Sequence, residues 1–234
     1  MWFKRQNYRK FSCLGGATSS DCRCGLAKRK SQIVGGGSNS WDKSEETEVN
    51  EHPWQVGLVD KGFTNIWCGG SIISNRWILS AAECLYGRDE VDVDDIEALL
   101  GEHDYTTTRE TKTYRMGISR IILHPDYPSV DINLSLLKMN KLMNFSNYPH
   151  IRPICLPNDP SEDYTGVTAT MVGWGTILDG YSGPLFNKLR KVDVKVLTNN
   201  DCKNNFNYHP SWITSPNLCA LNRKESCTGD LGME

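Results

Sequence analysis

The nine cysteines are the residues with the clearest chemistry in this chain of 234 residues. Cysteines at this density favour disulfide bonds, which form and persist in exported proteins and are rare in the cytosol. Because nine is an odd number, at least one thiol must lack an intramolecular partner. The remaining cysteines require a folded body that brings them together in pairs.

Length and composition describe a folded chain that is large enough for one sizeable domain or two small ones. Apolar residues make up 38% and charged residues 23% of the chain, and the mean hydropathy is −0.47. No apolar run reaches the roughly 18 residues that a membrane-spanning helix needs, so we expect no membrane span.

Charge divides the chain into a basic leader and an acidic body. Residues 1–30 hold eight Lys or Arg and one Asp, which leaves 18 basic and 27 acidic residues and a net charge of −9 for the rest. Nucleic-acid binding would require clustered basic side chains, so we expect no nucleic-acid partner. The cluster Lys28-Arg29-Lys30 could bind an anionic surface, but a solvated linker or protease-sensitive stretch is favoured.

The cysteine density favours an exported protein, but the amino terminus shows no signal for export. Residues 1–6 carry charges with no apolar stretch behind them, so we expect no secretory signal peptide in this chain. The simplest reconciliation with the cysteine density is that the chain is the inner piece of a longer precursor or an incomplete gene model. We expect an extracellular, secreted protein.

Short β-rich runs recur between turn-forming segments, which is typical of an all-β barrel or sandwich. Several runs alternate or are rich in β-branched residues, and they cover residues 54–58, 77–79, 118–123, 169–172 and 192–197. Segments rich in Gly, Pro, Asn and Asp predict turns at 35–37, 60–62, 124–126, 158–160 and 179–184. The polar, basic stretch up to residue 32 shows no strand pattern and is expected to be a tail or linker.

One long segment, CGGSIISNRWILSAAEC at residues 68–84, resembles the signature around the catalytic histidine of trypsin/chymotrypsin-like serine proteases. Further segments resemble that family in the same order: IVGG at 33–36, PW at 53–54, GEHD at 101–104, HP at 124–125, LLK at 136–138, ICLP at 154–157, VGWG at 172–175, NLCA at 217–220 and CTGD at 227–230. The resemblance implies an all-β fold of two antiparallel Greek-key β-barrels with the active cleft between them.

The resemblance also implies the domain boundaries. The segment Cys22-Arg23-Cys24-Gly25 looks like the junction of a CUB domain with a protease domain in arthropod CUB-type serine proteases. Residues 1–32 are therefore expected to be a leader that resembles the end of a CUB domain and a pro-segment. Residues 33–150 would form the first barrel and residues 151–234 a second barrel. That barrel is expected to be truncated and incomplete, because the family continues beyond its serine motif.

The family's chemistry needs a hydroxyl nucleophile, an imidazole base and a buried carboxylate that orients the imidazole. Glu83 stands at the histidine's position, and its carboxylate, with a reference pKa of about 4, is a poor base unless desolvation raises that pKa. Asn133 stands at the aspartate's position and supplies no charge, and Leu231 stands at the serine's position and has no nucleophilic atom. The resemblance therefore implies a homologue in which all three catalytic groups are substituted.

No other residue set replaces the three lost groups. The five histidines lie outside the base position, and each is expected to be a turn or surface residue: His52, His103, His124, His150 and His209. The backbone N–H groups of Gly229 and Leu231 could still form an oxyanion hole, but such a remnant gives only about 10³ to 10⁴ over water.

The activation segment also departs from the family pattern. Family members are cut after an Arg or Lys directly before the IVGG segment, and the new amino group pairs with the aspartate before the serine. Asp230 is present, but Gln32 precedes Ile33. A trypsin-like activator could cut after Lys30 and leave two extra residues, so we predict no normal zymogen activation.

Two further positions concern ligands. Glu225 occupies the base of the family's substrate pocket, where an acidic residue attracts Arg or Lys, although a solvated carboxylate is the favoured interpretation here. Glu102 and Glu110 lie on a loop that resembles a calcium loop of the family. Two carboxylates fall short of calcium's roughly six to eight oxygen ligands, so a surface loop is favoured and we expect neither a metal nor a cofactor.

Two segments, Asn133-Leu134-Ser135 and Asn144-Phe145-Ser146, match the acceptor pattern for N-glycosylation. We expect Asn133 to be buried beside a strand, which makes Asn144 the predicted acceptor. Family matching further implies disulfides between Cys68 and Cys84, Cys202 and Cys219, and Cys24 and Cys155, with Cys13 and Cys22 closing a loop in the leader. Cys227 is left unpaired, because its usual partner lies in the part of the fold that we expect to be missing.

The sequence therefore favours a non-catalytic serine protease homologue, an extracellular binding or regulatory module. The family implies protein partners, such as other extracellular proteases or their substrates, and leaves the oligomeric state open. An alternative is an incomplete or misassembled record of an active trypsin-like endopeptidase. A third possibility is a decayed transcript whose product never folds stably.

Overall fold

The structure is a computed structural model of the chain that describes residues 24–27, 44–87, 93–128, 132–157, 159, 162–175, 186–205, 213–214 and 217–221. Within these residues the secondary structure is almost entirely β. The strands are β1 (Glu45–Glu46), β2 (Gln55–Asp60), β3 (Cys68–Ile72), β4 (Trp77–Ser80), β5 (Ile96–Leu100), β6 (Tyr114–Leu123), β7 (Ser135–Met139), β8 (Thr168–Gly173), β9 (Arg190–Leu197) and β10 (Cys219–Leu221). The helical elements are a 3-10 turn, η1 (Val93–Asp95), and one short helix, α1 (Asn199–Asn205).

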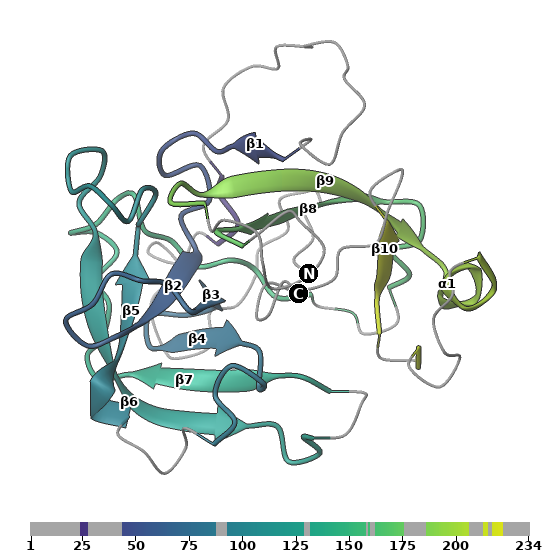
Figure 1. Cartoon of the computed structure of the whole chain (residues 1–234), viewed down its shortest axis with the longest axis horizontal. Helices are drawn as coiled ribbons and strands as arrows, with labels where there is room; N and C mark the ends of the chain where they lie inside the picture. The colour runs from purple at the N-terminus through teal and green to yellow at the C-terminus, as the bar shows by residue number, and fades with distance from the viewer. Residues whose placement is uncertain are drawn as a thin grey trace.

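Six of the strands close into a barrel in the order β2-β3-β4-β7-β6-β5, and neighbouring strands in it pair antiparallel (Figure 1). Burial alternates along β7, where Ser135, Leu137 and Met139 are buried and the residues between them are only partly buried. β4 alternates in the same way, with Ile78 and Ser80 buried. This period of two is what a strand with one face on a core requires.

Close strand packing explains one glycine of the barrel signature. Gly70 lies in β3, where a Cβ atom would come within 2.9 Å of both Ile78 Cγ2 and the backbone oxygen of Leu79. The second of these atoms belongs to the backbone of β4 and cannot turn aside. Glycine at this position therefore lets β3 and β4 approach each other.

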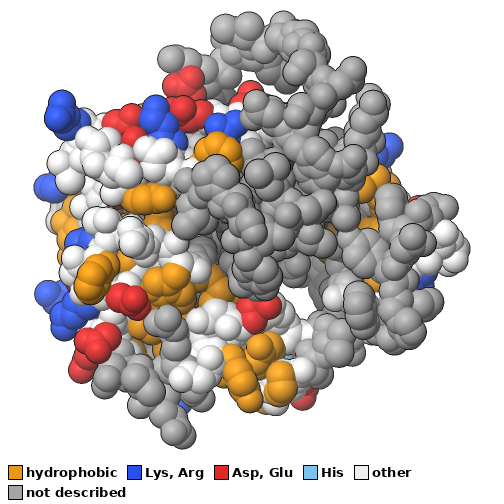
Figure 2. Space-filling view, in the orientation of Figure 1, with side chains coloured by type: hydrophobic (Ala, Val, Ile, Leu, Met, Phe, Trp, Pro, Cys, Tyr) orange, Lys and Arg blue, Asp and Glu red, His pale blue; other side chains and the backbone are white. Residues whose placement is uncertain are grey.

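A second, partial sheet is built around β9, which pairs with β1, β8 and β10. β1 precedes the barrel in the sequence, yet Glu45 is opposite Lys191 and Glu46 is opposite Arg190 in the register. Figure 1 shows β1 and β9 together above the barrel, and Figure 2 shows acidic and basic side chains side by side along that upper edge. The two halves of the chain are thus joined by a strand pairing over a long sequence separation.

The two parts have apolar cores of different size among the described residues. The barrel core contains Trp54, Val56, Leu58, Cys68, Ile72, Ile78, Leu85, Ile96, Ala98, Leu100, Met116, Ile118, Leu137, Met139, Met143, Ile151 and Ile154. The core of the second sheet contains Ala169, Val194 and Val196, with Tyr164, Met171, Val192 and Ala220 packed against it.

The expected all-β class is confirmed, and each of the five predicted strand runs overlaps a strand: β2, β4, β6, β8 and β9. The predicted turn at 60–62 is also present, with Gly62 at a positive φ of 84°. In the part of the chain that the structure describes, no helix has the length and apolar character needed to cross a membrane.

Candidate active site

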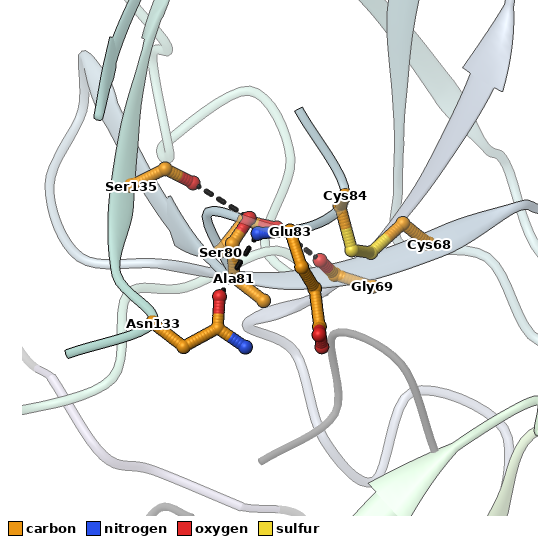
Figure 3. Close-up of a disulfide and its surroundings, with 8 residues drawn as sticks. All are labelled: Cys68, Gly69, Ser80, Ala81, Glu83, Cys84, Asn133 and Ser135. Atoms are coloured by element: carbon orange, nitrogen blue, oxygen red, sulfur yellow. Dashed lines mark hydrogen bonds between the residues drawn. A yellow bond between two sulfur atoms is a disulfide. The ribbon is translucent and has the colours of Figure 1, made fainter. Parts of the chain in front are cut away.

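Glu83 and Asn133 lie at the same edge of the barrel. β4 and β7 are antiparallel neighbours in which Ser80 is opposite Ser135, so the residues just after β4 face those just before β7. Glu83 is three residues past the end of β4, and Asn133 is two residues before β7 begins. The backbone N–H of Glu83 donates a hydrogen bond to Oδ1 of Asn133 at 2.9 Å (Figure 3). The two positions that resemble the catalytic histidine and aspartate are therefore in direct contact.

Buried hydroxyl groups fix the backbone at this edge. Ser135 Oγ donates to the carbonyl of Ala81 at 3.0 Å, and Ser80 Oγ donates to the carbonyl of Gly69 at 2.7 Å (Figure 3). Ser135 is 2% and Ser80 is 6% exposed. Each hydroxyl satisfies a backbone acceptor that is removed from water, which ties the turn after β4 to its neighbouring strands.

A disulfide between Cys68 and Cys84 adds a covalent tie directly beside Glu83 (Figure 3). Among the described residues there are two more disulfides, between Cys24 and Cys155 and between Cys202 and Cys219. These are the pairings that the resemblance implies for six of the nine cysteines.

The side chain of Glu83 is exposed, and two tyrosines lie near it. Tyr86 and Tyr127 form an edge-to-face pair with ring centroids 5.3 Å apart. Burial raises the pKa of Tyr127 above its ordinary value, and the nearby charges of Glu83 and Tyr86 raise it further. The surroundings of Glu83 thus keep the Tyr127 phenol neutral.

The chemistry available to this pair is limited. An amide at Asn133 cannot stabilise a positive charge on a base as a carboxylate does, and its Oδ1 already accepts the Glu83 N–H. Glu83 presents an exposed carboxylate at the position where the family has an imidazole. In the described part of the site, the two positions therefore carry a carboxylate and an amide that are joined through the backbone N–H of Glu83.

Several predicted positions lie outside the described residues. These are Gln32 and Ile33 of the activation segment, Glu225 of the pocket, Gly229, Asp230 and Leu231 of the serine motif, and Cys13, Cys22 and Cys227. The roles assigned to them remain predictions.

The loop that resembles a calcium loop is closed by side-chain contacts within the protein. Glu102 accepts hydrogen bonds from the His103 backbone N–H at 2.9 Å and from Thr113 Oγ1 at 2.7 Å. Glu110 Oε2 lies 2.7 Å from Nδ1 of His103. Among the residues that the structure describes, no group of three or more His, Cys, Asp or Glu side chains is placed to hold a metal ion.

His103 is buried: only 1% of its surface is exposed to solvent. Its Nε2 lies 2.9 Å from the carbonyl of Thr47, which can only accept, so Nε2 carries a proton. Its Nδ1 faces the Glu110 carboxyl, and a proton must lie between these two atoms, whether histidine or glutamate holds it.

The backbone carbonyl of His103 connects the barrel to the second half of the chain. The backbone N–H of Leu189 and the indole Nε1–H of Trp174 both donate to it at 2.9 Å. His103 thus contacts residues before, within and after the barrel. Sequence reasoning quoted this histidine within the GEHD segment but assigned no role to it.

The other histidines divide between buried and partly exposed positions. His52 is 6% exposed and packs edge-on against Trp54 at 5.7 Å, while His124 and His150 are partly buried. His52 and His103 lie in bends, as expected of turn residues, and both side chains are buried rather than exposed. His209 lies outside the described residues.

Comparison with known proteins adds an independent observation. A family profile described as Trypsin matches residues 42–232. A venom serine protease from Polistes dominula is 33% identical over 91% of this chain and 72% of its own length. Trypsin-2 from Salmo salar is 31% identical over 88% of this chain and 80% of its own length. The serine proteinase stubble from Drosophila melanogaster is 31% identical over 88% of this chain, which spans only 26% of that longer protein.

Proposed function

Because the chain belongs to the trypsin family of serine proteases, we propose that it is a non-catalytic member of the family. In this proposal the protease scaffold serves as an extracellular binding or regulatory module. Its partners are proteins, among them other extracellular proteases or their substrates.

The contact between Glu83 and Asn133 is the observation that carries the proposal. The backbone N–H of Glu83 and Oδ1 of Asn133 are 2.9 Å apart, so the frame of a histidine–aspartate pair is retained while both functional side chains differ. In a serine protease that keeps its histidine and serine, replacing the aspartate alone by asparagine lowers turnover about 10⁴-fold. Here the imidazole is replaced as well.

The third position supports the same conclusion at the level of sequence. Leu231 stands where the family has its serine, and a hydrocarbon side chain cannot attack a carbonyl carbon. Gln32 before Ile33 removes the basic residue after which family members are cut. Four independent changes therefore oppose proteolysis by the ordinary mechanism.

Disulfides support the extracellular part of the proposal. The three described disulfides close loops within the barrel, within the second half, and between the leader and the body. Such bonds persist in oxidising compartments and are rare in the cytosol. The wasp relative is named as a venom protein, which fits the same compartment.

Proteolysis is the second candidate function, and the names of the relatives favour it. The relatives include a venom serine protease and a trypsin, and the chain covers 72% and 80% of their lengths. Under this candidate this sequence would be an incomplete or misassembled record of an active trypsin-like endopeptidase.

Labelling with a biotinylated fluorophosphonate separates the two candidates, because this probe captures an activated serine. The proposal expects no labelled serine in the purified protein under conditions in which an equal amount of active trypsin is labelled completely. The variant Leu231→Ala is the matched control and should behave like the natural chain. A labelled serine, identified by peptide mapping, would overturn the proposal and support the endopeptidase.

A restored variant tests whether the scaffold itself is competent. The substitutions Glu83→His, Asn133→Asp and Leu231→Ser replace the three groups that the mechanism needs, and Gln32→Arg adds the basic residue after which trypsin can cut before Ile33. Labelling of this variant after cleavage, but not of the natural chain treated in the same way, would assign the lack of activity to these four positions.

A further inference from the structure

Two Asn-x-Ser segments flank β7, one on each side, and the structure gives them opposite settings. We infer that Asn144 is the N-glycosylation acceptor of this chain when it enters the secretory pathway, and that Asn133 is unmodified in the folded protein. The inference for Asn144 rests on the exposure of a turn that contains none of the catalytic positions.

Asn144 begins a tight turn. The backbone N–H of Asn147 donates to the carbonyl of Asn144 at 3.1 Å, and the backbone N–H of Ser146 donates to its side-chain Oδ1 at 3.0 Å. Both Asn144 and Ser146 are exposed. The local bond uses the side-chain oxygen of Asn144 and leaves Nδ2, the atom that would carry a sugar, directed away from that contact.

The neighbouring residues hold this turn on the barrel surface. Met143 is 4% exposed, and its backbone N–H donates to the carbonyl of Asn75 at 2.8 Å. Phe145 and Tyr148 pack against the barrel core as partly buried residues. Arg152 Nη1 donates to the carbonyls of Phe145 at 2.6 Å and of Tyr148 at 3.3 Å. The apolar members of the turn face the core, so the polar members between them face solvent.

The hydroxyl two residues after the asparagine is the second requirement of the acceptor pattern. Ser146 is exposed, and no described residue forms a hydrogen bond with its hydroxyl. An enzyme can therefore engage both Asn144 and Ser146 from the same side without disrupting a contact of the fold.

Asn133 meets neither requirement. The residue is half-buried, less deeply than the sequence suggested, whereas Asn144 is exposed. The Oδ1 of Asn133 accepts the backbone N–H of Glu83 at 2.9 Å, a bond to a distant segment rather than a bond within its own turn. Ser135 is 2% exposed, and its hydroxyl donates to the carbonyl of Ala81 at 3.0 Å. The Leu134 carbonyl between them accepts the His124 N–H at 2.9 Å, which ties this stretch to the end of β6. Modification here would require the edge of β7 to detach.

The reaction balances with one co-reactant, an oligosaccharide linked to a lipid through a pyrophosphate. A bond forms between Nδ2 of Asn144 and the anomeric carbon of the first sugar. The bond between that carbon and the pyrophosphate oxygen breaks, the lipid pyrophosphate leaves, and the amide nitrogen loses one proton. No oxidant or reductant is needed.

The test is expression of the whole chain behind a cleavable signal peptide in eukaryotic cells. Cell extract and medium are both treated with the amidase PNGase F, which removes N-linked glycans and converts the modified asparagine into aspartate. Trypsin cuts after Lys138 and Lys141, between the two acceptor patterns, so Asn133 and Asn144 fall on different peptides after reduction. We expect the conversion at Asn144 alone and a single mass shift on the intact protein.

Four variants distinguish the loss of the acceptor pattern from a failure of the protein to fold. Asn144→Gln and Ser146→Ala should lose the glycan, whereas Ser146→Thr, which keeps the acceptor pattern, should retain it. Asn133→Gln should retain the same single glycan as the natural chain. A glycan on Asn133 in secreted protein, or Asn144 unmodified in both extract and medium, would overturn the inference. Fluorophosphonate labelling of the glycosylated and deglycosylated protein reports the proposed function separately.

Discussion

The ammonium group of Lys191 lies 2.7 and 2.9 Å from the two carboxylate oxygens of Glu51 and joins β9 to the turn before β2. Burial opposes the charge on Glu51, but the hydrogen bond from Lys191, the backbone N–H of Glu48 and nearby positive charge outweigh it and lower its pKa. Burial likewise opposes the charge on Lys191, yet the hydrogen bonds to Glu51 and Glu45 raise its pKa. Both groups are therefore charged across the neutral range.

Substitution of Glu51 by glutamine should lower the free energy of unfolding by about 1.5–3 kcal/mol at neutral pH, because it removes a hydrogen-bonded charge pair. A carboxyl group whose pKa is lowered in the folded state contributes its full stabilisation at pH values above its ordinary pKa, which is 4.5 for glutamate. That contribution disappears as the pH falls through the folded-state value. Urea unfolding at several pH values should therefore show the difference between Glu51→Gln and the natural chain shrinking in acid.

Glu45 provides the matched control. Its carboxylate lies 3.2 Å from the same ammonium group, but its side chain is 71% exposed. Glu45→Gln should change the free energy of unfolding by less than about 1 kcal/mol, because solvent screens exposed pairs. Equal effects of the two substitutions would contradict the burial argument.

The hydroxyl of Ser135 should contribute to the stability of the candidate site. Ser135→Ala leaves the buried carbonyl of Ala81 without its donor and should cost about 1–3 kcal/mol. Ser119 donates to the carbonyl of Lys138 at 3.1 Å from an exposed position, so Ser119→Ala should cost about 0.5 kcal/mol or less. Chemical unfolding followed by tryptophan fluorescence measures both, and a larger loss for Ser119→Ala would count against this account.

His103 should couple the barrel to the second half of the chain. His103→Leu removes the contacts to Thr47 and Glu110 and should cost about 1–3 kcal/mol, chiefly because the carbonyl of the buried Thr47 loses its hydrogen-bond donor. Hydrogen exchange should then quicken at the backbone N–H of Thr47 and Leu189, which pair with each other and with His103.

Glu110→Gln is the conservative partner of this test. A glutamine amide N–H can donate to Nδ1 while the Nε2–H of a neutral His103 still donates to Thr47. The variant should therefore cost clearly less than His103→Leu. A Glu110→Gln variant as unstable as His103→Leu would show that the ring contacts depend on charge rather than on hydrogen-bond complementarity.

The disulfide between Cys24 and Cys155 should keep the leader attached after proteolysis. The backbone N–H of Gly25 also donates to the carbonyl of Pro153 at 2.9 Å beside this bond. Brief trypsin treatment should cut among the three basic residues that end at Lys30, and the released segment should separate on a gel only after reduction.

Two further measurements make this result decisive. In the double variant Cys24→Ser/Cys155→Ser, the cleaved segment should separate without a reductant. Amino-terminal sequencing of the natural chain should give a product that begins at Ser31. A product that begins at Ile33 would refute the prediction that normal activation does not occur.

Strand positions could be predicted where one face of a strand meets a core. The predicted run at 77–79 coincides with β4, in which Ile78 and Ser80 are buried and the residues beside them are partly buried. β7 shows the same alternation of burial, but its sequence SLLKM does not alternate and predicts no strand there. β1 could not be predicted in this way, because two adjacent glutamates carry no strand pattern. It becomes a strand because Lys191 and Arg190 of β9 lie opposite Glu45 and Glu46.

The candidate site was predictable in part for a similar reason. Resemblance identified Glu83 and Asn133, since each follows from a motif that is local in sequence. The hydrogen bond between them uses the backbone of Glu83 rather than its side chain, and no residue type encodes that choice. The burial of His103 depends on Thr47, Trp174 and Leu189, which are far from it in the sequence. A window of neighbouring residues contains none of these partners.

The long separation between Glu51 and Lys191 also has a consequence in time. The two residues are 140 positions apart, so at roughly 5–20 residues per second a ribosome makes Lys191 on the order of ten seconds after Glu51. The last strand of the barrel ends at Met139, well before β9 is synthesised. During this delay β1 has no β9 to pair with. The strand pairing of β1 therefore depends on residues made more than one hundred positions later, although β1 is the first strand to be synthesised.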